Sequence, residues 1–388
     1  MNFDSKNDST SPETVELPRD PISENTAKAL EVYGEMVESD YREFKEGFMR
    51  WLLTRGKNTY KNTGYSESTV VHTHYKIDEA FRWKWEQDGE YTTEFTHGDA
   101  TALIEILVTK SSHPDRYVYN FEKCVRRYFK YLRDERGREI DEWEHNIPIE
   151  QTKGSSEHIK DKFYPEEMNA IYEAALNRYS IPNLYSDTIT ERERDELKAL
   201  LAQRYGKSKD EITQDTFNAA SSWKIPSIIA VTSDTGLRPI EVGRAKAEWF
   251  DTDRGEMVVP AEEATKNKEY WNCRLSGKAI NAVRNWTRER ASYEKYHDEE
   301  GMWLTRYGNP YKARSLNRIL NDLIEEAGIT ERNRNLSWYS FRHGAATAWI
   351  EQEGLSRAKT QLRHNSIKTT EKYKRDGGNE SGGGDSYW

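Results

Sequence analysis

The sequence predicts a mainly α-helical protein that contains one small antiparallel β-unit. Along most of the chain, apolar residues recur at spacings of three and four, the period of a helix with one buried face. Between residues 249 and 275 this period gives way to two short strand-like runs joined by a polar turn. The chain has 388 residues, more than one core usually spans, so we expect two folded domains and tails.

The N-terminal part of the chain predicts an acidic tail followed by a helical domain. Residues 1–27 carry six acidic and two basic residues with almost no apolar periodicity, so we expect them to be disordered. Residues 28–150 contain four helical patterns, and the first places Leu30, Tyr33, Met36 and Val37 at helical spacing. Basic side chains lie off the apolar face of the last pattern, namely Arg126, Arg127 and Lys130. This domain is therefore either a simple bundle with solvated basic edges or a DNA clamp.

A second domain is expected over residues 165–375. Residues 151–164 contain Gly and Ser without periodicity and predict a linker, and a helix then begins at Pro165. A charged stretch, 177–219, has the composition of an insertion. The remaining elements are a buried helix ending near Gly236, the strands "EMVVP" and "YWNCRL", and helices from about Gly277 to Tyr373. The Gly-rich residues 376–388 predict a flexible C-terminal tail.

The composition excludes several classes of protein. No apolar run approaches the roughly 18 residues of a membrane helix, and the acidic N-terminus has no signal-peptide pattern. The two cysteines, Cys124 and Cys273, support neither a zinc site nor a disulfide framework. We therefore expect a cytoplasmic protein with no membrane association, no metal and no cofactor.

The charge distribution qualifies the net charge of −9, which by itself argues against a nucleic-acid partner. Residues 355–375 carry seven basic residues and one acidic residue. A local basic face of this kind can supply phosphate contacts in an acidic protein.

The stretch "DTGLRPIEVGRAK" places an arginine where a helix is expected to begin. Gly236 can turn the chain, and Pro239 is typical of a first helical turn. Arg238 and Glu241 are three residues apart and can share a face, so the carboxylate could steer the guanidinium. An arginine at a helix start is unfavourable unless an anion lies nearby. The alternative is a surface ion pair.

The stretch "SWYSFRHGAATAWI" places Arg342 before small residues that allow close helix packing. A buried arginine needs a partner, and two convergent arginines make a good clamp for phosphate oxygens. The alternative is a structural ion pair. We interpret His343, between Arg342 and Gly344, as a structural residue.

The stretch "TQLRHNSIKTTEKYKR" contains His364 and, nine residues later, Tyr373. Ser366 is a suitable N-cap for a short helix that leads to Tyr373. A lone tyrosine on a helix is usually a core residue, but basic neighbours such as Lys368 and Lys372 are a poor setting for one. They suit a phenol that loses its proton and attacks a phosphodiester. Phosphoryl transfer needs cations around the phosphate oxygens and a nucleophile. Arg238, Arg342, a lysine in the turn between the two strands (Lys266 or Lys268), His364 and Tyr373 together match these needs.

Four stretches resemble the tyrosine recombinase, or phage integrase, family: "TGLRPIEV", "TKNKEYWNCRLS", "SWYSFRHGAATAWI" and "LRHNSIKTTEKY". The sequences of these four stretches most resemble those of archaeal, particularly haloarchaeal, integrases. The resemblance covers residues 165–375, which would form a mixed α+β catalytic domain, but not the 177–219 stretch. It extends to residues 28–150 only by position and helical character, as the core-binding domain of the family.

The resemblance also implies roles for individual residues. The two catalytic arginines would be Arg238 and Arg342, with Glu241 as the supporting acid. Lys266 would protonate the leaving 5′ oxygen. His364 would bind a phosphate oxygen, and Tyr373 would be the nucleophile. Lys268 is the near alternative to Lys266, and further DNA contacts are expected from the basic residues Arg126, Arg127, Lys130, Arg363, Lys368 and Lys372. The family usually has a histidine three residues before the second arginine, and here that residue is Tyr339. A phenol, with a pKa of about 10, is a poorer base at neutral pH than an imidazole, but as a catalytic residue Tyr339 could still donate a hydrogen bond to the phosphate.

The implied reaction is a metal-free transesterification through a 3′-phosphotyrosyl link, carried out by four protomers on two specific sites in double-stranded DNA. Three alternatives remain: a type IB topoisomerase-like enzyme, a DNA-binding relative that has lost catalysis, and a structural helical protein. The last leaves the basic cluster around Tyr373 unexplained.

Overall fold

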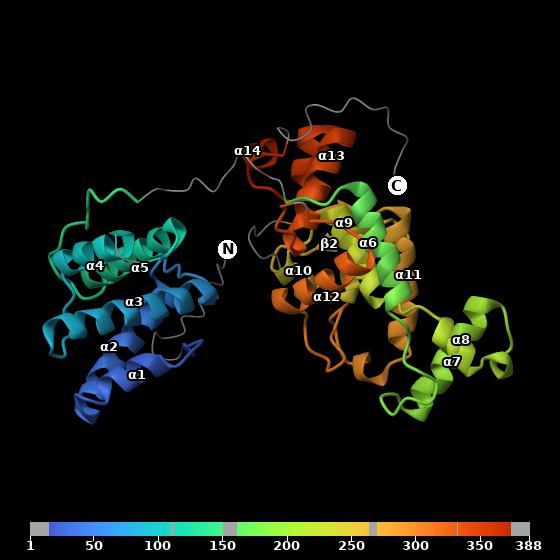
Figure 1. Cartoon of the computed structure of the whole chain (residues 1–388), viewed down its shortest axis with the longest axis horizontal. Helices are drawn as coiled ribbons and strands as arrows, with labels where there is room; N and C mark the ends of the chain where they lie inside the picture. Colours follow the sequence, from blue (N-terminus) through green and yellow to red (C-terminus); the bar gives the residue numbers. More distant parts are fainter. Residues whose placement is uncertain (1–14, 110–111, 150–160, 264–269, 332, 374–388) are drawn as a thin grey trace, which may run out of the picture. The chain divides into compact units, whose positions relative to one another are not determined.

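The computed structural model describes residues 15–109, 112–149, 161–263, 270–331 and 333–373. They form two compact units, one within residues 1–155 and the other within residues 156–388 (Figure 1). Within these described ranges, no helix has the length and apolar character needed to cross a membrane.

Helices make up most of the described part of the first unit. They are α1 (Glu24–Leu30), α2 (Glu35–Thr54), α3 (Glu67–Asp88), α4 (His97–Thr109) and α5 (Asp115–Asp134). Their buried faces meet in an aromatic core in which rings from α2, α3 and α5 contact one another, several of them edge to face, including Phe44, Phe81, Trp85 and Tyr128. Large rings that pack in this way supply much of the apolar burial that a small helical unit needs.

A fully buried ion pair lies within this core. The Nζ of Lys45 contacts Oδ1 of Asp78, and both side chains have no exposed surface. Asp78 also accepts hydrogen bonds from the hydroxyl of Tyr41 and the backbone N–H of Ser23. Burial by itself raises the pKa of Asp78, but Lys45 and these hydrogen bonds outweigh it and lower the pKa to about 2. Asp78 is therefore ionised, and it joins α2 and α3 to the chain before α1.

Two expectations for this region are wrong. The first helical pattern is interrupted: α1 ends at Leu30, and Gly34, with a φ of 94°, is the N-cap from which α2 starts, so that Met36 is 88% exposed. The expected disordered tail is also too long, because Leu17 packs against the core and Ile22 is buried in it. Residues 1–14 lie outside the described residues.

The second unit is organised around a buried helix, α9 (Lys224–Thr235). All residues of α9 from Ile225 to Thr235 are buried, which confirms the predicted buried helix ending near Gly236. It packs against α6 (Pro165–Arg178), α11 (Gly277–Ala291) and α13 (Trp338–Gln361). The other helices are α7 (Glu191–Tyr205), α8 (Gln214–Ala219), α10 (Pro239–Arg244), α12 (Ala313–Glu326) and α14 (Ile367–Glu371).

A three-stranded antiparallel sheet accompanies these helices, with the order β1 (Phe250–Asp251), β2 (Glu256–Val259) and β3 (Trp271–Arg274). Val259 lies opposite Trp271, so the two predicted strands form the expected hairpin. The short strand β1 was not predicted. The end of the hairpin, residues 264–269, lies outside the described residues, and so do Lys266 and Lys268.

One side chain joins the sheet to two helices. The amide of Gln361, at the end of α13, donates to Arg274 O at 2.8 Å and accepts from Arg274 N at 3.1 Å. The same amide donates to the carbonyl of Asp234 near the end of α9, and Trp271 donates to the carbonyl of Gln361. The ends of α9, β3 and α13 are therefore held together at one point.

The expected linker also ends too late. Phe163 is 1% exposed, its ring lies 4.8 Å from that of Phe341, and its backbone N–H donates to Ser340 O. A Cβ on Gly344 would lie 2.4 Å from Phe163 O, so this segment passes α13 where only glycine fits. Residues 161–164 therefore belong to the packed second unit.

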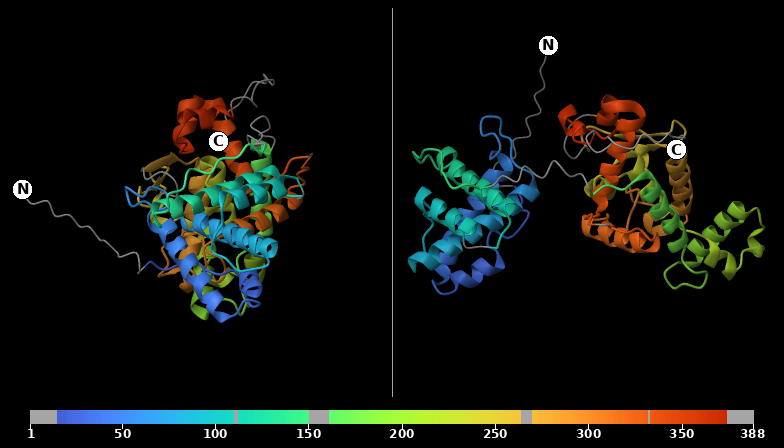
Figure 2. Two further views of the ribbon diagram at one scale, coloured as in Figure 1. Left: turned by 90° about the vertical axis from the view of Figure 1, so that its left-hand side faces the viewer. Right: turned by 45° about the horizontal axis from the view of Figure 1, so that its top comes forward.

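Within the second unit, α7 and α8 lie at the opposite end from α14 and the C-terminal half of α13 (Figures 1 and 2). The helix α9 begins at Lys224, and Gly236 directly follows its last residue.

Replacing Gly236 with alanine should destabilise the second unit. Gly236 has a φ of 61°, and a Cβ there would lie 2.8 Å from Leu362 Cδ2 and 3.1 Å from Arg342 Cγ. The strained backbone and these contacts should together lower the free energy of unfolding by about 1–3 kcal/mol, measured by urea denaturation. Gly206→Ala is the matched control, because Gly206 also ends a helix at a φ of 64° but has open space around it. Equal losses in the two variants would contradict the proposed close packing at Gly236.

Candidate active site

Arg238 stands immediately before α10, where Pro239 occupies the first helical position. Its Nη1 donates to Oε1 of Glu241 at 2.9 Å, and its backbone N–H donates to Oε2 of the same carboxylate at 2.8 Å. The predicted pairing is therefore present. Glu241 is buried, so it holds the guanidinium in one orientation rather than neutralising it at the surface.

Arg342 lies in the first turns of α13 and is only 3% exposed. Its Nη1 donates to the carbonyl of Gly236 at 2.8 Å, and its Nη2 donates to the carbonyl of Leu362. Burial, and next the positive charge of Arg238, lower the pKa of Arg342 to about 10. Arg342 therefore remains a cation at neutral pH. A guanidinium has five N–H donors, so two carbonyl contacts leave others for a ligand.

His364 lies between α13 and α14 and is 7% exposed. Its Nδ1 lies 3.0 Å from the hydroxyl of Thr370, and its backbone N–H donates to Lys359 O. Burial, followed by the charges of Arg342 and Arg238, lowers the pKa of His364 to about 3. At neutral pH this imidazole is therefore uncharged and serves as a hydrogen-bonding group.

Tyr373 follows α14, whose N-cap is Ser366 as predicted, with the Ser366 hydroxyl accepting from Lys368 N. The Tyr373 ring lies parallel to the His364 ring at 5.8 Å and edge to face with the His343 ring at 5.6 Å. Burial raises the pKa of this half-buried phenol above its usual value, and the charges of Arg342 and Arg238 offset only part of that rise. Tyr373 is therefore protonated in the free protein, and the two arginines reduce the cost of forming the phenolate that a nucleophilic tyrosine needs.

The chain thus brings together five of the residues singled out in the sequence: Arg238, Glu241, Arg342, His364 and Tyr373. Tyr339 lies in the first turn of α13, is 47% exposed and is close enough to influence the charge of Arg342. Two convergent cations, a neutral imidazole and a phenol can bind the oxygens of a phosphate and present an oxygen nucleophile to its phosphorus.

The other basic residues singled out have varied settings. In the first unit, Arg126 pairs with Glu122, Arg127 donates to Thr73, and Lys130 donates to the carbonyl of Gly56. These three side chains are thus engaged in holding their own unit together. In the second unit, Lys368 and Lys372 are exposed, and the Arg363 guanidinium lies 5.7 Å from the Trp271 ring.

His343 was interpreted as structural, yet its ring faces Tyr373. The available signal was its position directly after Arg342. The contact itself depends on the return of the chain from α13 through α14, which no local pattern reveals.

Comparisons with known proteins assign a family to part of the second unit. Residues 187–379 match the phage integrase family model. The match includes residues 187–219, which the sequence resemblance left out. None of the curated proteins matches the chain.

Two solved structures illustrate the likeness of fold. The XerH site-specific recombinase bound to a palindromic difH substrate, a post-cleavage complex, is 15% identical, with 84% of this chain and 81% of that chain covered and a TM-score of 0.51. The pre-cleavage complex of XerH with difH is also 15% identical, with 92% and 88% covered and a TM-score of 0.50. The chain therefore carries a domain of the phage integrase family, the tyrosine-type site-specific recombinases.

Proposed function

We propose that this protein is a site-specific DNA recombinase that cleaves and rejoins strands through a 3′-phosphotyrosyl link, with Tyr373 as the nucleophile. The observation that carries this proposal is the position of the Tyr373 phenol near Arg238 and Arg342, whose charges offset part of the rise in pKa that burial causes. A core tyrosine has no need of two buried or half-buried cations.

The proposed step exchanges one phosphodiester bond for another. The Tyr373 oxygen attacks the phosphorus, a new P–O bond forms, and the bond from phosphorus to the 5′ oxygen breaks. The phenol loses a proton and the 5′ oxygen gains one. Arg238 and Arg342 hold the non-bridging oxygens, where negative charge accumulates in the transition state. A 5′ hydroxyl from a partner strand then reverses the attack and releases Tyr373.

Two further groups complete the proposed centre. His364, neutral because of its lowered pKa, offers a hydrogen bond to a phosphate oxygen. Lys266 would protonate the leaving 5′ oxygen, with Lys268 as the alternative, on the basis of the sequence resemblance alone. Glu241 is a positioning residue, since it acts on DNA only through Arg238.

His343 is our candidate for the group that accepts the Tyr373 proton. The usual family histidine is replaced here by Tyr339, and a phenol is a poor proton acceptor at neutral pH. The His343 ring lies edge to face with the Tyr373 ring, and an imidazole is the side chain most often used as a general base.

The finer features of the assembly are also proposals. The family resemblance supports a tetramer on two paired DNA sites, with the helical first unit and the exposed Lys368 and Lys372 contacting DNA. The sequences of the four motifs support an archaeal, haloarchaeal-like source, and the composition supports a cytoplasmic location. Light scattering of the protein mixed with two duplex sites would measure the number of protomers.

Tyr373→Phe should abolish the covalent protein–DNA band on a denaturing gel after incubation, in EDTA, with a nicked duplex that carries the attachment site. Phenylalanine has no oxygen to form the phosphotyrosyl bond. Tyr185→Phe is the control, because Tyr185 is 76% exposed in the same unit and should leave the band unchanged. Absence of a band with the unmodified protein, despite DNA binding, would favour the catalytically inactive relative. A band accompanied by relaxation of plasmids without paired sites would favour the topoisomerase-like enzyme.

Arg342→Lys should slow single-turnover cleavage by about 10²–10³-fold, the usual cost of losing one transition-state donor. A lysine cannot bind both the Gly236 and Leu362 carbonyls and still present a planar fork to phosphate. Arg357→Lys is the control, since Arg357 pairs with Glu353 on the exposed surface of α13. A reduction confined to DNA affinity, with an unchanged cleavage rate at saturation, would contradict this role.

The cleavage rate should fall in a single step as the pH is lowered, because a protonated His343 cannot accept the Tyr373 proton. His364 should add no step between pH 5 and 8 in the free protein, since its pKa is about 3. His343→Gln should therefore slow cleavage and remove the step, while His297→Gln, at an exposed position, should preserve both. If the step survives in His343→Gln and disappears in Tyr339→Phe, the assignment of the base is wrong.

A further inference from the structure

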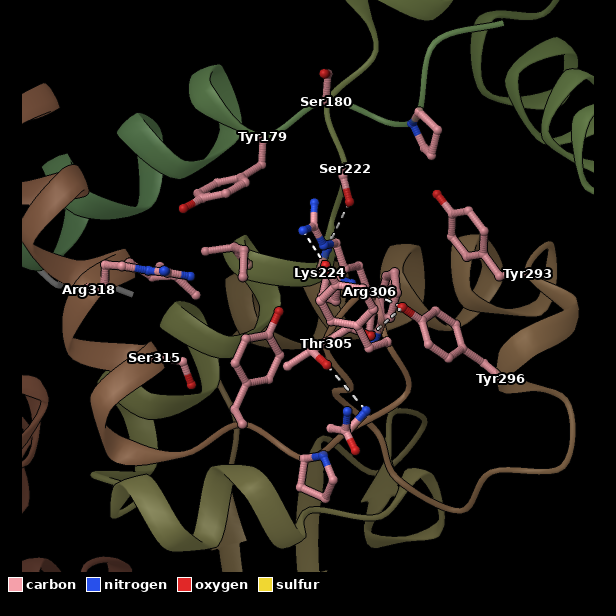
Figure 3. A pocket seen from close by; sticks show the side chains of 18 of the residues that line it. Tyr179, Ser180, Ser222, Lys224, Tyr293, Tyr296, Thr305, Arg306, Ser315 and Arg318 are labelled. Carbon is pink, nitrogen blue, oxygen red and sulfur yellow. Dashed lines mark hydrogen bonds between the residues drawn. The ribbon is translucent and has the colours of Figure 1, made fainter. Parts of the chain in front are cut away.

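A cleft lies at the end of α9 remote from Tyr373. It has a volume of about 2330 Å³ and is bounded by the end of α6, the start of α9, the loop 305–311 and α12. Figure 3 shows Tyr179 and Arg318 on one side, Tyr293 and Tyr296 on the other, and Lys224 and Arg306 between them. The 12 residues of α9 span about 18 Å, so the cleft and the candidate active site are distinct.

Positive charge dominates the lining of this cleft. Its six cationic side chains are Lys224, Lys295, Arg306, Lys312, Arg314 and Arg318, and its two acidic ones are Glu289 and Asp322. Among the described residues, none of the six forms an ion pair, whereas Asp322 pairs with Arg178 outside the lining. The buried Glu289 is satisfied by Ser222 Oγ and by the backbone N–H of Trp223. Six cations that form no ion pair, in a chain of net charge −9, indicate an anionic ligand.

The helices that border the cleft add to its positive potential. Both α9 and α12 begin there, with Lys224 as the first residue of α9, Lys312 as the N-cap of α12, and Arg314 in its first turn. Neither helix has an acidic residue in its first turn. Basic residues at helix N-termini are unfavourable unless an anion compensates them, so this arrangement costs stability in the absence of a ligand.

Lys224 is the innermost of these cations. Its Nζ donates to the hydroxyl of Tyr296 and to the carbonyl of Leu304, both at 3.1 Å. Burial lowers the pKa of Lys224 to about 8. A bound anion would stabilise its charged form, because an opposite charge raises the pKa of a lysine.

The size and aromatic lining of the cleft distinguish among anions. Ligand pockets for small molecules measure about 300–1,000 Å³, so this cleft suits an extended polymer. Tyr307 is 72% exposed, and the Arg306 guanidinium stacks 4.6 Å from the centre of its ring. Single-stranded nucleic acids are bound by cations along the phosphates combined with aromatic rings on which bases stack. Hydroxyls such as those of Tyr179 and Ser315 can add phosphate contacts.

We propose that this cleft is a binding site for a single-stranded nucleic-acid segment, independent of sequence and separate from the cleavage centre. The choice of DNA as the anion rests on the proposed function. The positive lining and the unpaired cations do not depend on it.

The test is fluorescence anisotropy of the full chain with a labelled 16-nucleotide oligothymidine strand. The double variant Arg306→Glu/Arg318→Glu should weaken binding at least tenfold. It should also reduce the slope of log affinity against log salt by about 0.7 for each phosphate contact removed. Both side chains are exposed, so the fold should survive, which circular dichroism would verify.

Arg288→Glu is the charge-matched control, since Arg288 is exposed on α11 outside the cleft, and it should bind within twofold of the unmodified protein. Tyr307→Ala, which leaves the charge unchanged, should weaken binding several-fold through lost stacking.

Two results would overturn the proposal. One is equal strand binding by the double variant and by Arg288→Glu. The other is a poly-glutamate peptide that displaces the strand at equal charge concentration and is bound just as well by Tyr307→Ala, which would identify an acidic peptide as the occupant. The covalent-band assay on the same preparations separates this test from the proposed function. If the protein forms the covalent band but the cleft variants bind the strand normally, only the proposal for the cleft is rejected. If it forms no band but binds the strand through the cleft, only the proposed cleavage activity is rejected.

Discussion

The candidate active site depends on one buried cation. The Arg342 guanidinium is fixed by the carbonyls of Gly236 and Leu362, which end α9 and α13 respectively. Burying a cation is costly unless its donors are satisfied, so these contacts oblige the two helix ends to meet. Gly236 makes the approach possible, because any Cβ there would collide with Leu362 and Arg342. The chain that leaves this junction carries His364 and then Tyr373 to the two arginines.

The electrostatics of the site follow from the same junction. Burial and the neighbouring guanidiniums keep His364 neutral, whereas the same guanidiniums favour the ionised form of Tyr373. The same two cations thus disfavour the charged form of His364 and favour the charged form of Tyr373, whose rings stack on each other. At the other end of α9, the cations of the cleft form no ion pair among the described residues. An acidic chain therefore presents positive charge in two confined places, a distribution that suits a protein acting on a polyanion.

The elements with strong local signals were predicted correctly. The period of three and four residues identified α6 and α9, and the change to a strand-like period identified β2 and β3. Local signals failed where packing decided the outcome. Gly34 interrupts a helical pattern that continues on both sides of it, and Phe163 is buried by α13 in a segment whose composition resembles a linker. Neither burial partner is near in the sequence, so neither could be inferred from it.

The sequence by itself determined which chemical groups this protein has and how they are spaced: the Arg238–Glu241 pair, an arginine before small residues, and a tyrosine among lysines. These follow from side-chain type and helical spacing, which are local properties. Only the tertiary structure decided that Arg342 is buried against two carbonyls, that His343 faces Tyr373, and that six cations meet at the start of α9. Each of these is a contact between segments far apart in the chain, and such contacts arise from the packing of the whole unit around α9.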